Sequence, residues 1–155
     1  MDILKYNKGD KMRLYYIFSI KDEIYKITKN NPEKLYEVIK SIYLLDKKDK
    51  KIGYKVFERT CNFFDKKNIN IHIKNLNLDN YSYTCFRNNH IINDFYNNET
   101  TRLTVNYSHL LLKTNILYPK FLSEIRNLKH LFICDFQNED YFYLKDISSK
   151  KEIYS

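Results

Sequence analysis

Residues 14–23 read LYYIFSIKDE, and this stretch decides how the chain begins to fold. Its first seven residues are apolar or aromatic except for one serine, and no polar residues alternate with them. A run this short, rich in aromatic and β-branched side chains, is typical of a strand covered on both faces. The charges of residues 21–23 suit a helix start, where carboxylates meet the positive end of the helix dipole. We therefore expect a core strand at residues 13–20 that leads directly into a short helix at residues 22–29.

Two more helices are expected before the middle of the chain. Asn31 is a good N-cap, and Pro32 at the first helical position loses no hydrogen bond. The residues that follow form an apolar stripe at helical spacing: Leu35, Val38, Ile39, Ile42 and Leu45. A charged turn at residues 46–51 then precedes a third helix at about residues 52–64.

The second half of the chain is expected to consist mainly of strands. Residues 69–77 alternate between isoleucine and polar side chains, which predicts a half-exposed strand with residues 81–86 as its hairpin partner. A further strand is expected at residues 102–112, and Pro119 opens a last helix. The apolar run at residues 131–136 and the segment at residues 141–144 form a closing hairpin. A short apolar piece between residues 88 and 98 fits no single type.

The predicted fold class is α+β: one domain with a mixed, mainly antiparallel sheet of five to six strands and about four helices. The element order is β-α-α-α-β-β-β-α-β-β. We expect the helices to cover largely one face of the sheet, and the strands at residues 14–20 and 131–136 to lie centrally. The domain spans residues 13–146, between a flexible arm at residues 1–12 and a flexible tail at residues 147–155.

Composition narrows the classes of function. The chain carries 27 Lys and Arg against 19 Asp and Glu, a net charge of +8, which favours acidic partners. The abundance of Lys, Asn, Ile and Tyr also resembles the codon bias of an AT-rich genome, so these lysines can equally be simply solvated. With 2 glycines, the chain cannot form a glycine-rich phosphate loop. The sequence contains neither a signal peptide nor a membrane span, which predicts a cytoplasmic protein with three reduced, buried cysteines.

Few residues suggest catalysis or metal binding. The four histidines, at positions 72, 90, 109 and 130, show none of the spacings of a metal or nucleophile motif. Asp135 interrupts an apolar strand, and we expect its carboxylate to accept backbone hydrogen bonds in the next turn. We predict no enzyme activity, no metal, no cofactor, no membrane partner and no small-molecule substrate. One alternative function is a small nucleic-acid-binding module whose basic run is interleaved with Tyr54, Phe63 and Phe64: Lys47, Lys48, Lys50, Lys51, Lys66 and Lys67.

Three sequence blocks resemble the family of the sporulation inhibitor of replication, SirA. The first is Tyr15-Tyr16-x-Phe18-x-Ile20-Lys21-Asp22-Glu23, which is similar to the opening of that family. The second combines Asn75-Leu76-Asn77 with Tyr81, Tyr83 and Phe86-Arg87. The third is Leu131-Phe132-x-x-Asp135-Phe136-x-x-x-x-Tyr141-x-x-Leu144, which is similar to the family's closing hairpin. The order and spacing of the blocks fit over residues 13–146.

The resemblance implies a non-enzymatic inhibitor that binds the N-terminal domain of the replication initiator DnaA and prevents new rounds of replication during sporulation. No direct nucleic-acid contact is then expected. The family's partner-binding surface includes aromatic positions shortly after the acidic pair. In this chain the corresponding position is Ile24, with Tyr25 beside it, and the next aromatic position of the family falls near Thr28. These three residues are the expected partner-binding residues.

Overall fold

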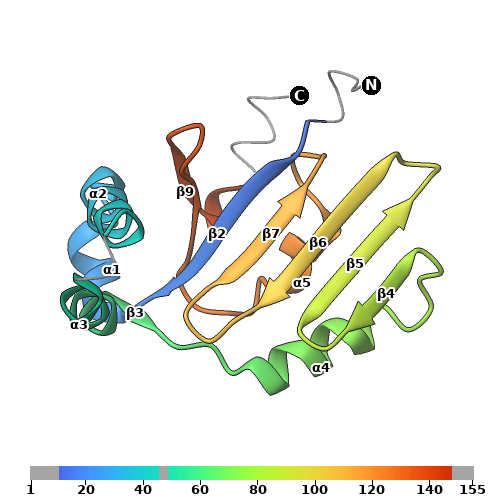
Figure 1. The fold of residues 1–155 in the computed structure, drawn as a ribbon, viewed down its shortest axis with the longest axis horizontal. Helices are drawn as coiled ribbons and strands as arrows, with labels where there is room; N and C mark the ends of the chain where they lie inside the picture. The colour runs from blue at the N-terminus through green and yellow to red at the C-terminus, as the bar shows by residue number, and fades with distance from the viewer. Residues whose placement is uncertain (1–10, 46–48, 148–155) are drawn as a thin grey trace.

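The computed structural model describes residues 11–45 and 49–147. Within these ranges the chain forms an α+β fold with a single antiparallel sheet of eight strands (Figure 1). Most of the proposed arm, the three residues of the charged turn from Asp46 to Lys48, and residues 148–155 of the proposed tail lie outside the described residues. The helices are α1 (Asp22–Thr28), α2 (Pro32–Tyr43), α3 (Lys50–Thr60), α4 (Lys66–Leu76), α5 (Lys120–Glu124) and the short 3-10 helix η3 (Leu144–Asp146).

The strand predicted from the opening stretch lies inside the sheet. The strand order is β4-β5-β6-β7-β2-β8-β9, and the two-residue strand β3 pairs with the end of β2. As expected, β2 and β8 are paired on both sides, and β8 and β9 form the closing hairpin. The strands are β2 (Arg13–Ile20), β3 (Cys61–Asn62), β4 (Tyr83–Phe86), β5 (Asn89–Asp94), β6 (Glu99–Val105), β7 (Leu110–Thr114), β8 (Leu131–Asp135) and β9 (Asp140–Tyr143).

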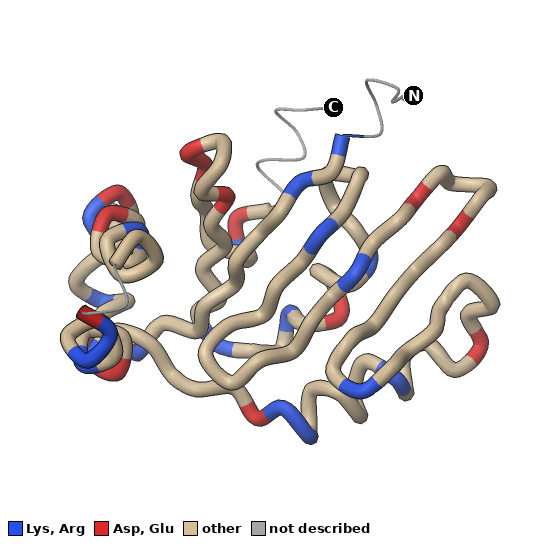
Figure 2. Tube along the Cα trace, viewed as in Figure 1, with Lys and Arg blue, Asp and Glu red and all other residues tan. Residues whose placement is uncertain are grey.

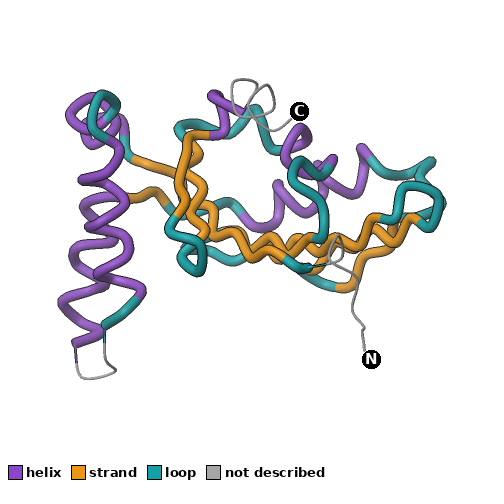
Figure 3. Tube along the Cα trace, turned by 90° about the horizontal axis from the view of Figure 1, so that it is seen from above, coloured by secondary structure: helices purple, strands orange, loops and turns teal. Residues whose placement is uncertain are grey.

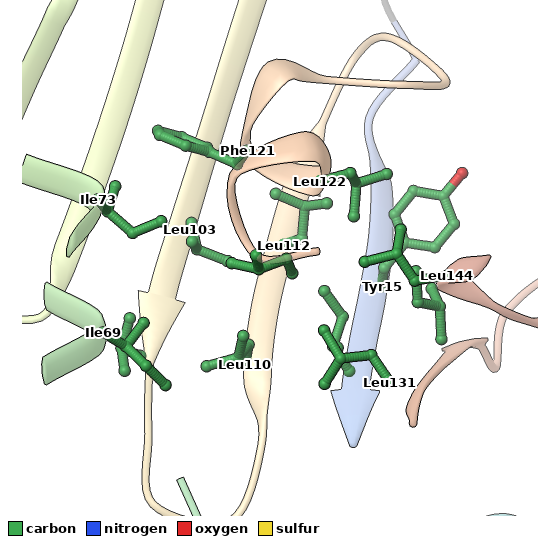
Figure 4. Close-up of a cluster of buried hydrophobic side chains, with 14 of the residues drawn as sticks. Tyr15, Ile69, Ile73, Leu103, Leu110, Leu112, Phe121, Leu122, Leu131 and Leu144 are labelled. Carbon is green, nitrogen blue, oxygen red and sulfur yellow. The ribbon is translucent and has the colours of Figure 1, made fainter. Parts of the chain in front are cut away.

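The two faces of β2 belong to two different cores. Tyr15 and Ile17 point into a core closed by α4 and α5, which Figure 4 shows in close-up. Phe18 and Ile20 point the other way, into a smaller core that α2 and α3 cover. Because successive side chains of a strand point to opposite faces, a strand that is apolar on both faces needs helices on both sides. The expectation that helices cover largely one face is therefore wrong for β2, β8 and β9, whose second face packs against α2 and α3.

The two helical layers differ in extent. The α4–α5 layer lies over the sheet, whereas the α2–α3 pair stands at one end and extends past the sheet on the opposite side (Figure 3). The second face of β4 to β7 is left without a helix. Among the described residues, no helix combines the length and the apolar character needed to cross a lipid bilayer.

The strand predicted at residues 69–77 is wrong, because this segment belongs to helix α4. Ile69 and Ile73 are buried at i, i+4 spacing, whereas Ile71 is 48% exposed. Three isoleucines two residues apart match a strand face, but the first and third also match one face of a helix. Asp65 decides between the two, since its carboxylate accepts a hydrogen bond from the backbone N–H of Asn68 and caps the helix.

Three further boundaries are corrected. The expected strand at residues 102–112 is the hairpin of β6 and β7, which turns at residues 106–109. The segment at residues 88–98 contains β5, which replaces residues 69–77 as the hairpin partner of β4. The expected helix at residues 52–64 ends at Thr60, where the chain pairs with β2 and crosses from one core to the other. Phe63 consequently lies near Phe57, whereas Phe64 joins the core beneath α4.

Candidate functional site

Helix α1 carries the expected partner-binding residues and is tied to the sheet at its start. The backbone N–H groups of Ile20 and Lys21 donate to the carbonyl oxygens of His130 and Thr60, each at 3.0 Å. His130 Nε2 lies 2.6 Å from Asp22 Oδ1, and this hydrogen bond lowers the pKa of the Asp22 carboxyl. His130 has a φ of 48°, a left-handed conformation that aims its ring at α1. The beginning of α1 therefore has a fixed position on the surface.

Tyr25 anchors α1 instead of projecting from it. Its ring stacks on His130, with centroids 4.0 Å apart and 11° between the planes, and meets Tyr143 edge to face at 5.2 Å. Lys145 donates a hydrogen bond to Tyr25 Oη and lies 4.8 Å from the centre of the ring. Aromatic contacts of this kind each add about 0.5–1.5 kcal/mol beyond the burial of their area. The half-buried Tyr25 thus presents only part of its ring to a partner.

The other two expected residues are also partly engaged. Ile24 is half-buried against the core of α2 and α3. The hydroxyl of Thr28 donates to the carbonyl oxygen of Ile24 at 2.7 Å, so its proton is already used within the helix. Ile27, three residues after Ile24 on the same helix, is 74% exposed. Ile27 was not among the expected partner-binding residues, although its spacing of three from Ile24 marked it as part of the apolar surface of α1.

A second apolar surface, which the sequence did not predict, lies between α2, α3 and the sheet. We call it the helix-pair groove; it has a volume of about 930 Å³. Tyr16 and Phe18 of β2 form its floor, and Ser108 and His109 close it from the β6–β7 turn. Its walls come from α2 and α3: Ile39, Ile42, Tyr43, Gly53, Tyr54 and Phe57.

The floor of the helix-pair groove is held by aromatic contacts. The ring of Tyr16 lies 5.0 Å from Tyr43, 5.2 Å from Phe136 and 5.4 Å from His109. Burial lowers the pKa of His109, which keeps the imidazole uncharged at neutral pH. Burial likewise raises the pKa of Tyr16 to about 12. The floor is therefore uncharged, with hydroxyl and imidazole groups available for a few hydrogen bonds.

Asp135 and His90, two buried polar residues that the sequence singled out, have structural partners. The carboxylate of Asp135 accepts hydrogen bonds from the backbone N–H and the side-chain amide of Asn138, at 3.2 and 2.7 Å, which confirms the expected turn. His90 lies between Tyr83 Oη, at 2.7 Å from Nδ1, and Asn70 Oδ1, at 2.8 Å from Nε2. In the two described ranges, no cluster of three or more His, Cys, Asp or Glu side chains could hold a metal ion.

The proposed nucleic-acid surface is divided between separate elements. Lys50 and Lys51 lie on α3 beside the helix-pair groove, whereas Lys66 and Lys67 begin α4, where the ammonium of Lys66 lies 4.6 Å from the centre of the Tyr107 ring. Lys47 and Lys48 lie outside the described residues. Of the three aromatic residues predicted for this surface, Phe64 is buried, so only Tyr54 and Phe63 are available to contact nucleic acid.

The cysteines follow the expectation with one exception. Cys61 and Cys134 are buried, and burial raises the pKa of the Cys61 thiol to about 12. Cys85 on β4 is exposed, so the prediction that all three are buried is wrong at this position. All three are free thiols.

Comparison of the chain with models of known protein families and with curated proteins gives no match.

Proposed function

We propose that this chain is a non-enzymatic, cytoplasmic inhibitor of replication initiation that binds the N-terminal domain of DnaA, as its resemblance to the SirA family implies. The observation that carries the proposal is the position of the block that ends in Ile20-Lys21-Asp22-Glu23. This block enters a short surface helix whose start is fixed by His130 and whose Asp22, Glu23 and Ile27 side chains are exposed. A rigid helix that presents apolar and acidic groups suits a protein partner, since little side-chain entropy is lost on binding.

The contact surface we propose is the outer side of α1, with Ile24, Tyr25 and Thr28 at its base and Ile27 at its centre. An inhibitor of this kind acts by occlusion: it covers a face of DnaA that other initiation proteins need. The affinity then depends on the apolar side chains, while the net positive charge of the chain mainly affects the rate of encounter.

The test is a calorimetric titration of the full chain against the isolated N-terminal domain of DnaA from the same organism. We expect saturable one-to-one binding that weakens about tenfold or more in Ile27→Asp and in the double variant Ile24→Ala/Tyr25→Ala. Ile71→Asp, on the exposed side of α4, is the matched control and should bind like the wild type. Binding that persists unchanged in both α1 variants would contradict the proposed surface, and absence of binding by the wild type would contradict the function.

A nucleic-acid-binding module remains the second candidate, on a surface other than the one the sequence suggested. Arg102 and Lys113 are cross-strand neighbours on the uncovered face of β6 and β7, and Figure 2 shows basic positions in a row across these strands and β2. Phe86 is 65% exposed on β4. Binding of single-stranded DNA that falls steeply with salt and is lost in Arg102→Gln/Lys113→Gln would favour this function. Lack of binding at low salt would remove it.

A further inference from the structure

We infer that the helix-pair groove is a second protein-binding site, which takes an amphipathic helix with an acidic polar side from a partner protein. This inference does not depend on DnaA or on α1, because the groove shares no lining residue with the expected partner-binding residues. The shape, the exposed apolar area and the charge of the helix-pair groove and its rim support this site.

The apolar surface is larger than the groove itself. Ile52, Tyr54 and Phe63 line the groove and are 63%, 55% and 48% exposed, so much of their apolar area faces water. Exposed apolar patches of this kind on a folded domain mark sites of interaction. A small apolar ligand would fill the groove and leave this rim exposed, whereas a helix lying along α3 would cover both.

The floor of the groove excludes a partner that binds as an added strand. β2, which forms this floor, is paired with β7 on one side and β8 on the other, so its backbone donors and acceptors are already used. Strand addition requires an unpaired edge, and the edges of the described sheet are β4 and β9. The groove therefore offers side chains alone, as in recognition of an apolar helix face by a hydrophobic groove.

The charged groups around the groove determine which charge a partner must carry. The charged residues that line it are Lys50, Lys51, Lys55 and Glu58, three positive groups against one negative group. In the described part of the chain, none of these lysines forms an ion pair with an acidic side chain. Arg102 and Lys113 extend the positive surface across the open sheet face beyond the groove. A helix with Asp and Glu flanking its apolar stripe complements this pattern, whereas a basic helix is repelled.

The experiment is a selection of helical peptides from a display library against the full chain, followed by fluorescence-anisotropy titration of the enriched peptides. We expect peptides with apolar residues at i, i+3, i+4 and i+7 and a net negative charge. Their affinity should fall about tenfold or more in Ile52→Ser/Tyr54→Ser and in Lys51→Glu/Lys55→Glu. The exposed positions of these residues leave the fold intact, which circular dichroism verifies.

The matched control is Ile71→Ser/Lys74→Glu on α4, which should change the affinity less than twofold. Enrichment of neutral or basic peptides, or equal binding to the wild type and to the groove variants, would overturn the inference. A parallel calorimetric titration with dodecanoate tests the small-ligand alternative. Saturable dodecanoate binding that is lost in Ile52→Ser/Tyr54→Ser, without selection of acidic helices, would also overturn it. Variants at Ile27 separate this site from the proposed DnaA site, since they should not affect peptide binding.

Discussion

The two helical layers of this protein cover the same sheet in different ways. Above one face, α4 and α5 close a core in which Phe121, Ile73 and Leu103 are fully buried (Figure 4). The buried polar groups of His90, Asn77 and Glu124 on this side are hydrogen-bonded. On the other face, α2 and α3 cover only one end of the sheet and leave the helix-pair groove beside Phe57. The two layers therefore have different roles. The closed layer provides most of the apolar burial, while the open layer retains apolar surface that a partner can cover.

The largest expected effect is the loss of a ring from the closed layer. Phe121→Ala should reduce the free energy of unfolding by about 3–5 kcal/mol, because its side chain is fully buried and its loss leaves a cavity between α5 and the sheet. Phe57→Ala is the counterpart in the open layer, and it should cost about 2–3 kcal/mol, since its buried ring borders an existing groove that already leaves one side unpacked. Urea unfolding of both variants measures the two values. Equal losses would show that the two layers are packed to the same degree.

The second prediction concerns pH and His90 in the closed layer. Burial lowers the pKa of His90 to about 4, whereas the unfolded chain has a value near 6.5. Between these values the unfolded state binds more protons, so stability is fully present above about pH 6.5 and is lost as the pH falls toward 4. The loss should reach about 2–3 kcal/mol.

The measurement is the urea midpoint of the wild type and His90→Gln between pH 7.5 and 4. The variant should show a shallower decline, because it lacks the group that takes up the proton. His109 in the open layer, whose pKa burial also lowers, contributes in the same direction, and His109→Gln measures its share. A slope that is unchanged in His90→Gln would show that this histidine is not the acid-sensitive group of the closed layer.

The third prediction tests whether the contacts of Tyr25 fix helix α1 in place beside the open layer. Tyr25→Ala removes the stack on His130 and the contact with Tyr143, and it should reduce the free energy of unfolding by about 1–2 kcal/mol. Ile27→Ala removes an exposed side chain of the same helix and should change stability by less than about 0.5 kcal/mol. Thermal unfolding of both variants at pH 7 gives the comparison. Similar values for the two would mean that Tyr25 does not anchor the helix.

Local sequence patterns correctly predicted those helices and strands whose pattern fits only one type of secondary structure. The continuous apolar runs of β2 and β8 indicated internal strands, and Asn31-Pro32 with the apolar stripe after it indicated α2. Asn31 holds the N-cap position, although its side chain makes no capping hydrogen bond. The three isoleucines at 69, 71 and 73 fit both a strand and a helix, so their spacing could not identify α4.

The candidate surfaces were less predictable, because they depend on where the chain crosses the sheet. Phe63 and Phe64 are adjacent in sequence and were both predicted at the end of the third helix, yet Phe64 packs into the core beneath α4 and Phe63 lies near Phe57. Tyr25 was expected at the partner surface, but its neighbours His130 and Lys145 are more than a hundred residues away in sequence. No local pattern contains those contacts, and none indicates that α2 and α3 stop short of closing over Tyr16.

The smallest expected effect concerns Gly53, and it tests how easily the side chains between α2 and α3 can move. Gly53 lies inside α3, where replacement by alanine gains about 1 kcal/mol of helix propensity. An added Cβ would lie 2.7 Å from Leu45 Cδ1, which is too close, and 3.8 Å from Ile42 Cγ2, which is an ordinary contact. Leu45 is 38% exposed, so its side chain can rotate away at a cost of about 0.5–1 kcal/mol. Gly53→Ala should therefore change the free energy of unfolding by less than about 0.5 kcal/mol.

The double variant Gly53→Ala/Leu45→Ala separates the two contributions, because removing the Leu45 side chain also removes the conflict with the new methyl group. Compared with Leu45→Ala alone, it should recover most of the helix-propensity gain of about 1 kcal/mol, which makes the pair non-additive in urea unfolding. A loss above about 2 kcal/mol in Gly53→Ala would contradict this account. It would mean that α2 and α3 are held as tightly as α4 and α5, and that the groove is a fixed gap between rigid walls to which a partner helix must fit without adjustment of the helix pair.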